Sequence, residues 1–173
     1  MCTFVVHVDI YCSNFLLPTE KIVGMNHYAY PYAISRDHSI YTFDSYGPNG
    51  KITKIVQYIS RDAAGITFFN LGFGDLDPET GKIDDLAVSN NLDKARVLAT
   101  VAATVVDVTS KLPDAIIYVR GSTPSRTRLY QMGVSANWEQ ISALLHVYGF
   151  APSDGWQSYQ KNINYEAFLA RRK

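Results

Sequence analysis

The spacing of apolar residues changes near residue 90, and this change limits the possible folds more than any other feature of the chain. Before it, side chains alternate in four segments, at 39–46, 51–60, 66–73 and 82–89. The segments are separated by turn sequences at 47–50, 61–65 and 77–81. A period of two is typical of strands, and connections this short join antiparallel neighbours. We therefore predict an antiparallel meander of four strands.

Between Leu92 and Leu112 the apolar residues recur at steps of three and four, which predicts an amphipathic helix. Asn91 is the expected N-cap, and the helix dipole favours Asp93 in the first turn. Many β-branched residues lower the helix propensity of this segment. Burial against other elements must therefore stabilise the helix.

The remaining sequence alternates strand and helix signals. Residues 115–120 are expected to form a short strand buried on both faces. Thr123 as N-cap and Pro124 at the first helical position predict a second helix, which ends near Met132 with Gly133 as its C-terminal residue.

The segment from Trp138 to Leu145 either forms a further short helix or leads into a strand, and late strands are expected at 144–150 and 165–169. The whole order predicts an α+β (mixed α/β) fold, in which an antiparallel strand meander is followed by helix, strand, helix and strands.

Composition narrows the class of protein. The 173 residues are 47% hydrophobic and 18% charged, which is enough to bury the core of one domain. Sixteen basic and sixteen acidic residues give zero net charge. This balance argues against a globally basic nucleic-acid binder and a polybasic membrane protein, but it does not exclude a local basic patch. No apolar stretch is long enough to span a bilayer, so no membrane partner is expected.

The first 24 residues are expected to form a poorly packed extension upstream of a natural start at Met25, and residues 25–173 to form a single α+β domain. Cys2 and Cys12 belong to no CxxC pair and no His/Cys cluster, so reduced thiols are expected rather than a zinc site or a disulfide. This cysteine usage predicts a cytoplasmic protein.

The sequence IIYVRGSTPSRTRLYQMG contains the most informative site candidate. A strand ends in Arg120, a turn of small residues follows, and a helix begins. Unpaired amides and the dipole make a helix N-terminus attractive to anions, and arginine forks suit phosphate or carboxylate groups. The predicted anion-binding residues are Arg120, Ser122, Thr123, Arg126 and Arg128. The alternative is an ordinary capped helix with solvated arginines.

Tyr130 follows Arg126 by four residues and shares its helical face. It is either a proton donor or a packed aromatic residue.

A second candidate is the acidic hairpin GDLDPETGKIDD, whose carboxylates are Asp75, Asp77, Glu79, Asp84 and Asp85. Such oxygen ligands suit hard cations, but the pattern of a calcium loop is absent, so a solvated turn is expected and no metal site is predicted. Asp84 or Asp85 could instead face the arginines as a base or an ion-pair partner. The histidines at 27, 38 and 146 are isolated and form no recognisable catalytic set.

Long segments of the chain resemble a family of uncharacterised bacterial proteins of about this size, from about Met25 to the C-terminus. The resemblance rests on YTFDSYGPNGKI, NLGFGDLDPETGKIDDLAVSNN, VLATVA, GSTPSRTRLYQMG and NYEAFLARRK. It implies a domain of unknown function and no particular activity.

The order of strand, helix, strand and helix over residues 83–132 is also similar to the core of the GNAT N-acetyltransferases. The stretch RLYQMGV, from Arg128 to Val134, resembles the helix in which a tyrosine of that superfamily protonates the departing coenzyme A thiolate. The resemblance gives this role to Tyr130. The glycine-rich turn that binds the coenzyme A pyrophosphate has no counterpart in SNNLDKAR (89–96), so the resemblance implies a modified acyl-CoA site.

Two functions follow as hypotheses. The first is a non-enzymatic binding module without a cofactor, which holds phosphate, nucleic acid or an acidic partner protein, as in a regulatory or toxin–antitoxin component. The alternative is a GNAT-like acyltransferase that uses acyl-CoA, with Tyr130 as general acid and Asp84 or Asp85 as base.

Overall fold

The computed structural model describes residues 28–84, 87 and 89–173 of the chain. The expectation for residues 1–24 lies outside this range, and a single domain over 25–173 stays a prediction.

The described residues form nine strands and three helices. The strands are β1 (Tyr32–Ile34), β2 (Ile40–Gly47), β3 (Gly50–Ala63), β4 (Ile66–Leu76), β5 (Ile83–Asp84), β6 (Ile117–Val119), β7 (Leu145–Ala151), β8 (Gly155–Ser158) and β9 (Ala167–Arg172). The helices are α1 (Lys94–Lys111), α2 (Pro124–Ala136) and α3 (Trp138–Leu144).

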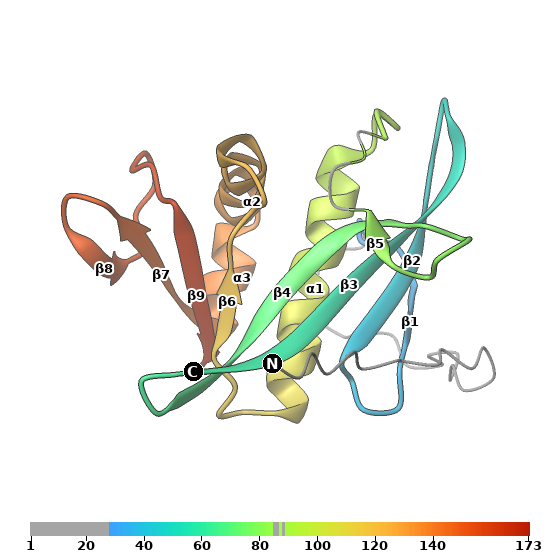
Figure 1. Cartoon of the computed structure of the whole chain (residues 1–173). Helices are drawn as coiled ribbons and strands as arrows, with labels where there is room; N and C mark the ends of the chain where they lie inside the picture. The colour runs from blue at the N-terminus through green and yellow to red at the C-terminus, as the bar shows by residue number, and fades with distance from the viewer. Residues whose placement is uncertain (1–27, 85–86, 88) are drawn as a thin grey trace, which may run out of the picture.

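All the strands belong to one sheet, in the order β1-β2-β3-β4-β6-β9-β7-β8, with β5 paired to β4. Every pairing is antiparallel except that of β4 with β6. In Figure 1 the three helices lie on one side of the sheet, behind it in this view. The predicted α+β class with a mostly antiparallel sheet is confirmed.

The meander is confirmed for β2, β3 and β4, but two of its boundaries were predicted wrongly. Arg61 belongs to β3, and the turn consists of Ala64 and Gly65 alone, with φ of 51° and 77°. Two consecutive positive φ angles make the tight turn that follows the twist of a hairpin. Of the strand expected at 82–89, the described residues that pair are Ile83 and Asp84, and residues 85, 86 and 88 lie outside the described range.

Helix α1 is stabilised by burial, as its β-branched sequence requires. Its buried face includes Val101, Val105 and Val108. Thr100 and Thr104 are completely buried, and each hydroxyl donates to a carbonyl of the preceding turn. Polar groups can be buried in this way because their hydrogen bonds are satisfied locally.

The predicted N-cap of α1 was wrong. Asp93 occupies the cap position, and its side chain makes no capping bond. Its carboxylate instead accepts hydrogen bonds from the hydroxyls of Tyr30 and Ser45, at 2.9 and 2.6 Å. Asn91 is buried and donates to Ser45 and to the Gly50 carbonyl. Tertiary partners thus replace local capping at this helix.

Thr123 is the N-cap of α2, as predicted, and its hydroxyl accepts a hydrogen bond from the Arg126 amide. Gly133 does not end the helix, which continues to Ala136. A Cβ at Gly133 would lie 3.1 Å from the Cβ of Leu98 on α1. The glycine is therefore explained by the close approach of the two helices rather than by a C-cap.

The segment from Trp138 to Leu144 is a helix, which resolves the two alternatives given for it. The late strands β7 and β9 are confirmed within a few residues. Strands β1 and β8 were not predicted, because at three and four residues they are too short to show a period.

Tyrosines form much of the core beside α1. The rings of Tyr32 and Tyr58 each pack edge-on against Tyr41, with centroids 5.6 Å apart. Burial raises the pKa of all three phenols well above the ordinary value of 10.0. The main cause is that the phenolate would lose its hydration.

We predict that the fold loses stability in alkali. Above about pH 10 the unfolded chain releases phenolic protons that the native state retains, so the free energy of unfolding falls as pH rises. Circular dichroism and tyrosinate absorbance should show these tyrosines ionising only as the protein unfolds. The same titration in denaturant provides the control, in which all 12 tyrosines ionise together. Full ionisation near pH 10 with an unchanged fold would contradict this prediction.

Candidate functional site

The parallel strands β4 and β6 are joined along a short length only. Three residue pairs connect them, at Phe69–Ile117, Asn70–Tyr118 and Leu71–Val119. Beyond these pairs the strands diverge, as Figure 1 shows, because β4 continues toward β5 while the chain leaves β6 for α2. The gap opens at the carboxyl ends of both strands, where open α/β sheets commonly bind ligands.

A cavity of about 390 Å³ occupies this gap. It is lined by residues of β4, β5, β6, α2 and the turn between β6 and α2: Asn70, Leu71, Gly72, Phe73, Ile83, Tyr118, Arg120, Gly121, Ser122, Arg126 and Tyr130. We call it the β4–β6 cleft. Its volume is in the range of small-molecule sites.

The turn from β6 into α2 depends on Gly121. Its amide donates to the Thr127 hydroxyl at 3.0 Å. A Cβ at this position would clash with the backbone of Thr127 and the side chain of Arg126. The missing side chain lets the turn fold tightly onto the first turn of α2. As a result, Ser122 and Arg126 lie beside the end of β6.

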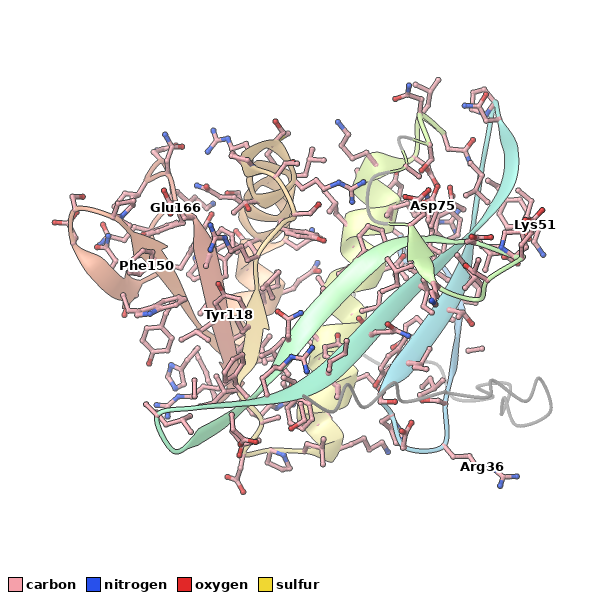
Figure 2. All side chains as sticks on the ribbon, viewed as in Figure 1. Arg36, Lys51, Asp75, Tyr118, Phe150 and Glu166 are labelled. Atoms are coloured by element: carbon pink, nitrogen blue, oxygen red, sulfur yellow. The ribbon has the colours of Figure 1, made fainter. Side chains whose placement is uncertain are left out.

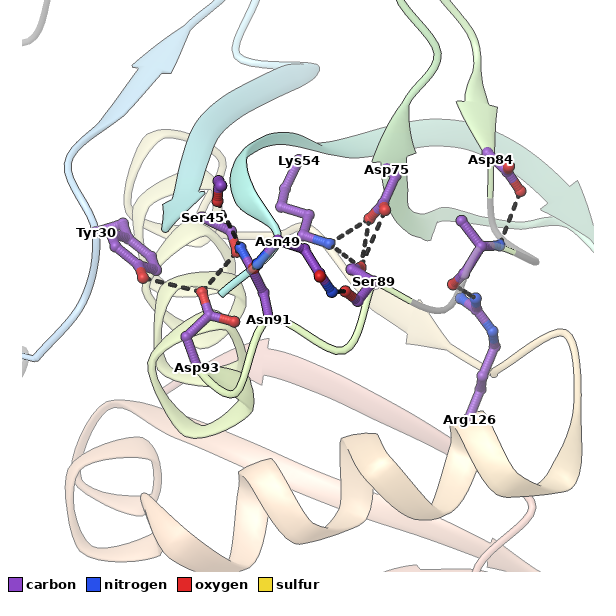
Figure 3. Close-up of polar contacts among 12 residues, drawn as sticks. Tyr30, Ser45, Asn49, Lys54, Asp75, Asp84, Ser89, Asn91, Asp93 and Arg126 are labelled. Carbon is purple, nitrogen blue, oxygen red and sulfur yellow. Dashed lines mark hydrogen bonds and ion pairs between the residues drawn. The ribbon is translucent and has the colours of Figure 1, made fainter. Parts of the chain in front are cut away.

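Arg126 is partly buried and tied to the opposite wall. Its Nη2 donates to the Ala87 carbonyl at 2.9 Å, and the Ala87 amide donates to the Asp84 carboxylate, also at 2.9 Å. Figure 3 shows this bridge between α2 and the segment after β5. The backbone of Ala87 thus lies between Asp84 and Arg126, and a role of Asp84 as a base or an ion-pair partner stays a prediction. Asp85 lies outside the described residues.

Two other donors at the cleft have no partner in the described ranges. The exposed side chains of Arg120 and Ser122 make no hydrogen bond or ion pair with the described part of the chain. The salt bridges found among the described residues include neither Arg120 nor Arg126. Within the described ranges, no carboxylate pairs with either guanidinium.

The structure brings together only part of the predicted anion-binding set. Tyr130 lines the cleft with Arg126, as their spacing predicts. Thr123 caps α2 and does not line the cleft. Arg128 faces another hollow of about 380 Å³, which it shares with Lys161, and donates to Asn164 at 2.9 Å.

In the acidic hairpin, the Asp77 carboxylate is used in hydrogen bonds that hold the turn. Asp77 accepts hydrogen bonds from the Glu79 amide and the Thr80 hydroxyl across the turn. These bonds lower its pKa, the Thr80 bond most strongly. Within residues 28–84, 87 and 89–173, no three His, Cys, Asp or Glu side chains come together as a possible metal site.

A buried polar cluster next to the cleft was missed by sequence reasoning. Lys54 is 4% exposed, and its ammonium contacts the Asp75 carboxylate and the Ser89 hydroxyl (Figure 3). Ser89 also donates to Asp75 at 3.0 Å. The sequence does contain a signal for the burial of Lys54, because alternation places it on the same strand face as the core residues Val56 and Tyr58. This cluster fastens the segment before α1 to β3 and β4.

These observations define a mixed α+β protein with a basic cleft between two diverging parallel strands. The model of DUF6934, a family of unknown function, matches residues 26–173, and the chain belongs to this family. No curated protein and no solved structure matches the chain. In the described residues no helix has both the length and the apolar character needed to cross a membrane.

We predict that Lys54→Met lowers the free energy of unfolding by about 3–5 kcal/mol, because the change leaves the Asp75 carboxylate poorly paired. Urea denaturation measures the effect. The double variant with Asp75→Leu should recover much of the loss. Lys51→Met is the matched control, since Lys51 pairs with Asp44 on the same hairpin but is 58% exposed. Equal effects of the two lysine substitutions would refute a structural role of the buried pair.

Proposed function

We propose that the protein is a binding module that holds a phosphate-bearing ligand in the β4–β6 cleft. The observation that carries this proposal is the convergence of Arg120, Ser122 and Arg126 at the cleft, where no carboxylate of the described part of the chain pairs with either arginine. Arginine forks bind phosphate oxygens through charge-assisted hydrogen bonds. A serine hydroxyl and the first turn of α2 add further donors for an anion.

The residues of the cleft have different roles in this proposal. Arg126 is held by Ala87, so its remaining N–H groups are pre-positioned and lose little freedom on binding. Arg120 is exposed and free to close on the ligand. Phe73 and Tyr118 supply aromatic surface for an organic group next to the phosphate.

We predict that the protein binds inorganic pyrophosphate and that Arg126→Ala weakens the affinity by about tenfold or more, the usual effect of losing a hydrogen bond to a charged group. Isothermal titration calorimetry measures it. Arg128→Ala is the matched control, because it removes an arginine two residues away that does not line the cleft. Wild-type protein that binds no pyrophosphate, or equal losses in both variants, would exclude the cleft as the anion site.

A second candidate is acyl transfer by a GNAT-like protein. The observation that favours it is the order β4, α1, β6, α2, with Tyr130 of α2 lining the gap between the parallel strands. The segment before α1 does not fit a glycine-rich pyrophosphate turn. Asn91 fills it with a buried side chain, Leu92 has a φ of 57°, and the cap residue Asp93 is acidic. An acyl-CoA pyrophosphate would have to bind at Arg120 and Arg126 instead.

Under this second candidate, Tyr130→Phe leaves the affinity for acetyl-CoA unchanged. It lowers the release of coenzyme A in the presence of amine acceptors by roughly 100-fold, as expected for a lost general acid. Calorimetry and a thiol assay separate the two effects, and Asp84→Asn tests the base by the same assay. Wild-type protein that neither binds acetyl-CoA nor releases coenzyme A would exclude acyl transfer and leave the binding module.

A further inference from the structure

The face of the sheet opposite the helices carries a row of aromatic side chains. Strand alternation turns Leu71, Ile117 and Phe168 toward the helices. The other set of positions on β4, β6, β7 and β8 holds aromatic residues that are half-buried or exposed: Phe68, Tyr118, Tyr148, Phe150 and Trp156. Figure 2 labels Tyr118 and Phe150 on this part of the sheet. The strand expected to be buried on both faces, β6, thus presents Tyr118 to an open face.

Several of these rings contact one another. Phe68 and Tyr118 lie 5.8 Å apart between centroids, Tyr118 and Trp156 lie 6.4 Å apart, and Phe150 and Trp156 lie 5.4 Å apart. The interplanar angles are between 56° and 70°. Trp156 is 44% exposed. The row therefore offers aromatic surface to a partner across several strands.

Positive charges surround the row. Arg61 on β3 lies opposite Phe68 of β4 in the strand register, and Arg120 follows β6 directly. Arg171 on β9 lies opposite His146 of β7. All four of these polar side chains are exposed.

In the described part of the chain, this face holds no Asp or Glu at any strand position of β3, β4, β6, β7, β8 or β9. Glu166 comes directly before β9, and strand alternation assigns it to the other face of the sheet. On β2 the same face carries Asp44, which pairs with Lys51, so unpaired cations gather on the part of the face that holds the aromatic row.

We propose that this face binds single-stranded nucleic acid. Aromatic side chains stack on bases of any sequence, and nearby arginines contact the phosphates. A protein partner would need either an uninterrupted apolar patch or carboxylates of its own, whereas alternating rings and cations match the bases and phosphates of one strand. This inference names a class of partner for the proposed function. It rests on the proposed function in one respect, which is that Tyr118 and Arg120 belong to both the face and the cleft.

The two tryptophans of the chain make the test direct. Trp138 packs against Tyr159 on the helix side, so Trp138→Phe leaves Trp156 as the only fluorescent tryptophan. In this variant, a short oligothymidylate and a short oligouridylate should quench the Trp156 fluorescence. Three arginine–phosphate contacts predict that the logarithm of the affinity falls with the logarithm of salt concentration with a slope of about −2.

Substitutions on the face separate stacking from charge. Tyr118→Leu should weaken binding by about tenfold or more, since one stacking platform is lost. Arg171→Ala should make the salt slope shallower by about 0.7. Arg36→Ala is the control, because Arg36 is exposed in the turn between β1 and β2, away from this face (Figure 2). Circular dichroism confirms that each variant is folded.

Absence of quenching overturns the inference, as does quenching that Tyr118→Leu and Arg171→Ala leave unchanged. A face that serves a protein partner would give the first of these results. Pyrophosphate binding reports on the cleft separately. If pyrophosphate does not bind but oligonucleotide binding depends on Arg171, the proposed function of the cleft fails and the nucleic-acid face stands.

Discussion

The short parallel contact between β4 and β6 is the constraint on which the rest of the structure depends. Parallel neighbours need a crossover connection, and α1 provides it. Because only three residue pairs join the strands, the sheet opens beyond them, and the first turn of α2 lies beside the opening. Longer pairing would close the cleft, and an antiparallel pair would place the start of α2 elsewhere.

Two polar clusters near this opening differ in a way that bears on function. Lys54 is buried, Asp75 is half-buried, and the two satisfy each other, so they contribute to the position of the segment before α1. Arg120 keeps an exposed guanidinium with no partner among the residues that the structure describes, and Arg126 is oriented by a neutral carbonyl. A cation that the fold holds in place without neutralising it is available to an anionic ligand. This contrast is the physical reason for assigning the cleft, rather than the Lys54 cluster, to binding.

Local patterns predicted the elements whose stability is local. The β2–β3 hairpin follows from its alternation and turn residues, and the start of α2 follows from Thr123 and Pro124. Predictions failed where distant residues determine the structure. Asn91 is a good cap by type, but its amide bonds to Ser45 and Gly50 on the first hairpin. Gly133 has the residue type of a helix end, but contact with Leu98 explains it.

The same division applies to the site. The sequence identified Arg120, Ser122, Arg126 and Tyr130, because a strand-to-helix turn and a four-residue spacing are local features. It did not identify the wall formed by β4, since the pairing of β4 with β6 spans more than 40 residues of chain. The predicted set also included Arg128. A helix places residues two apart on different sides, and Arg128 accordingly lines another hollow.

Chemical-shift mapping by nuclear magnetic resonance tests the central claim most directly. When inorganic pyrophosphate is added to isotope-labelled protein, the account predicts that the largest shifts fall on the amides of Gly72, Phe73, Gly121 and Ser122 and on the guanidinium of Arg126. Shifts confined to the hollow formed by Arg128 and Lys161, or an unchanged spectrum, would contradict it.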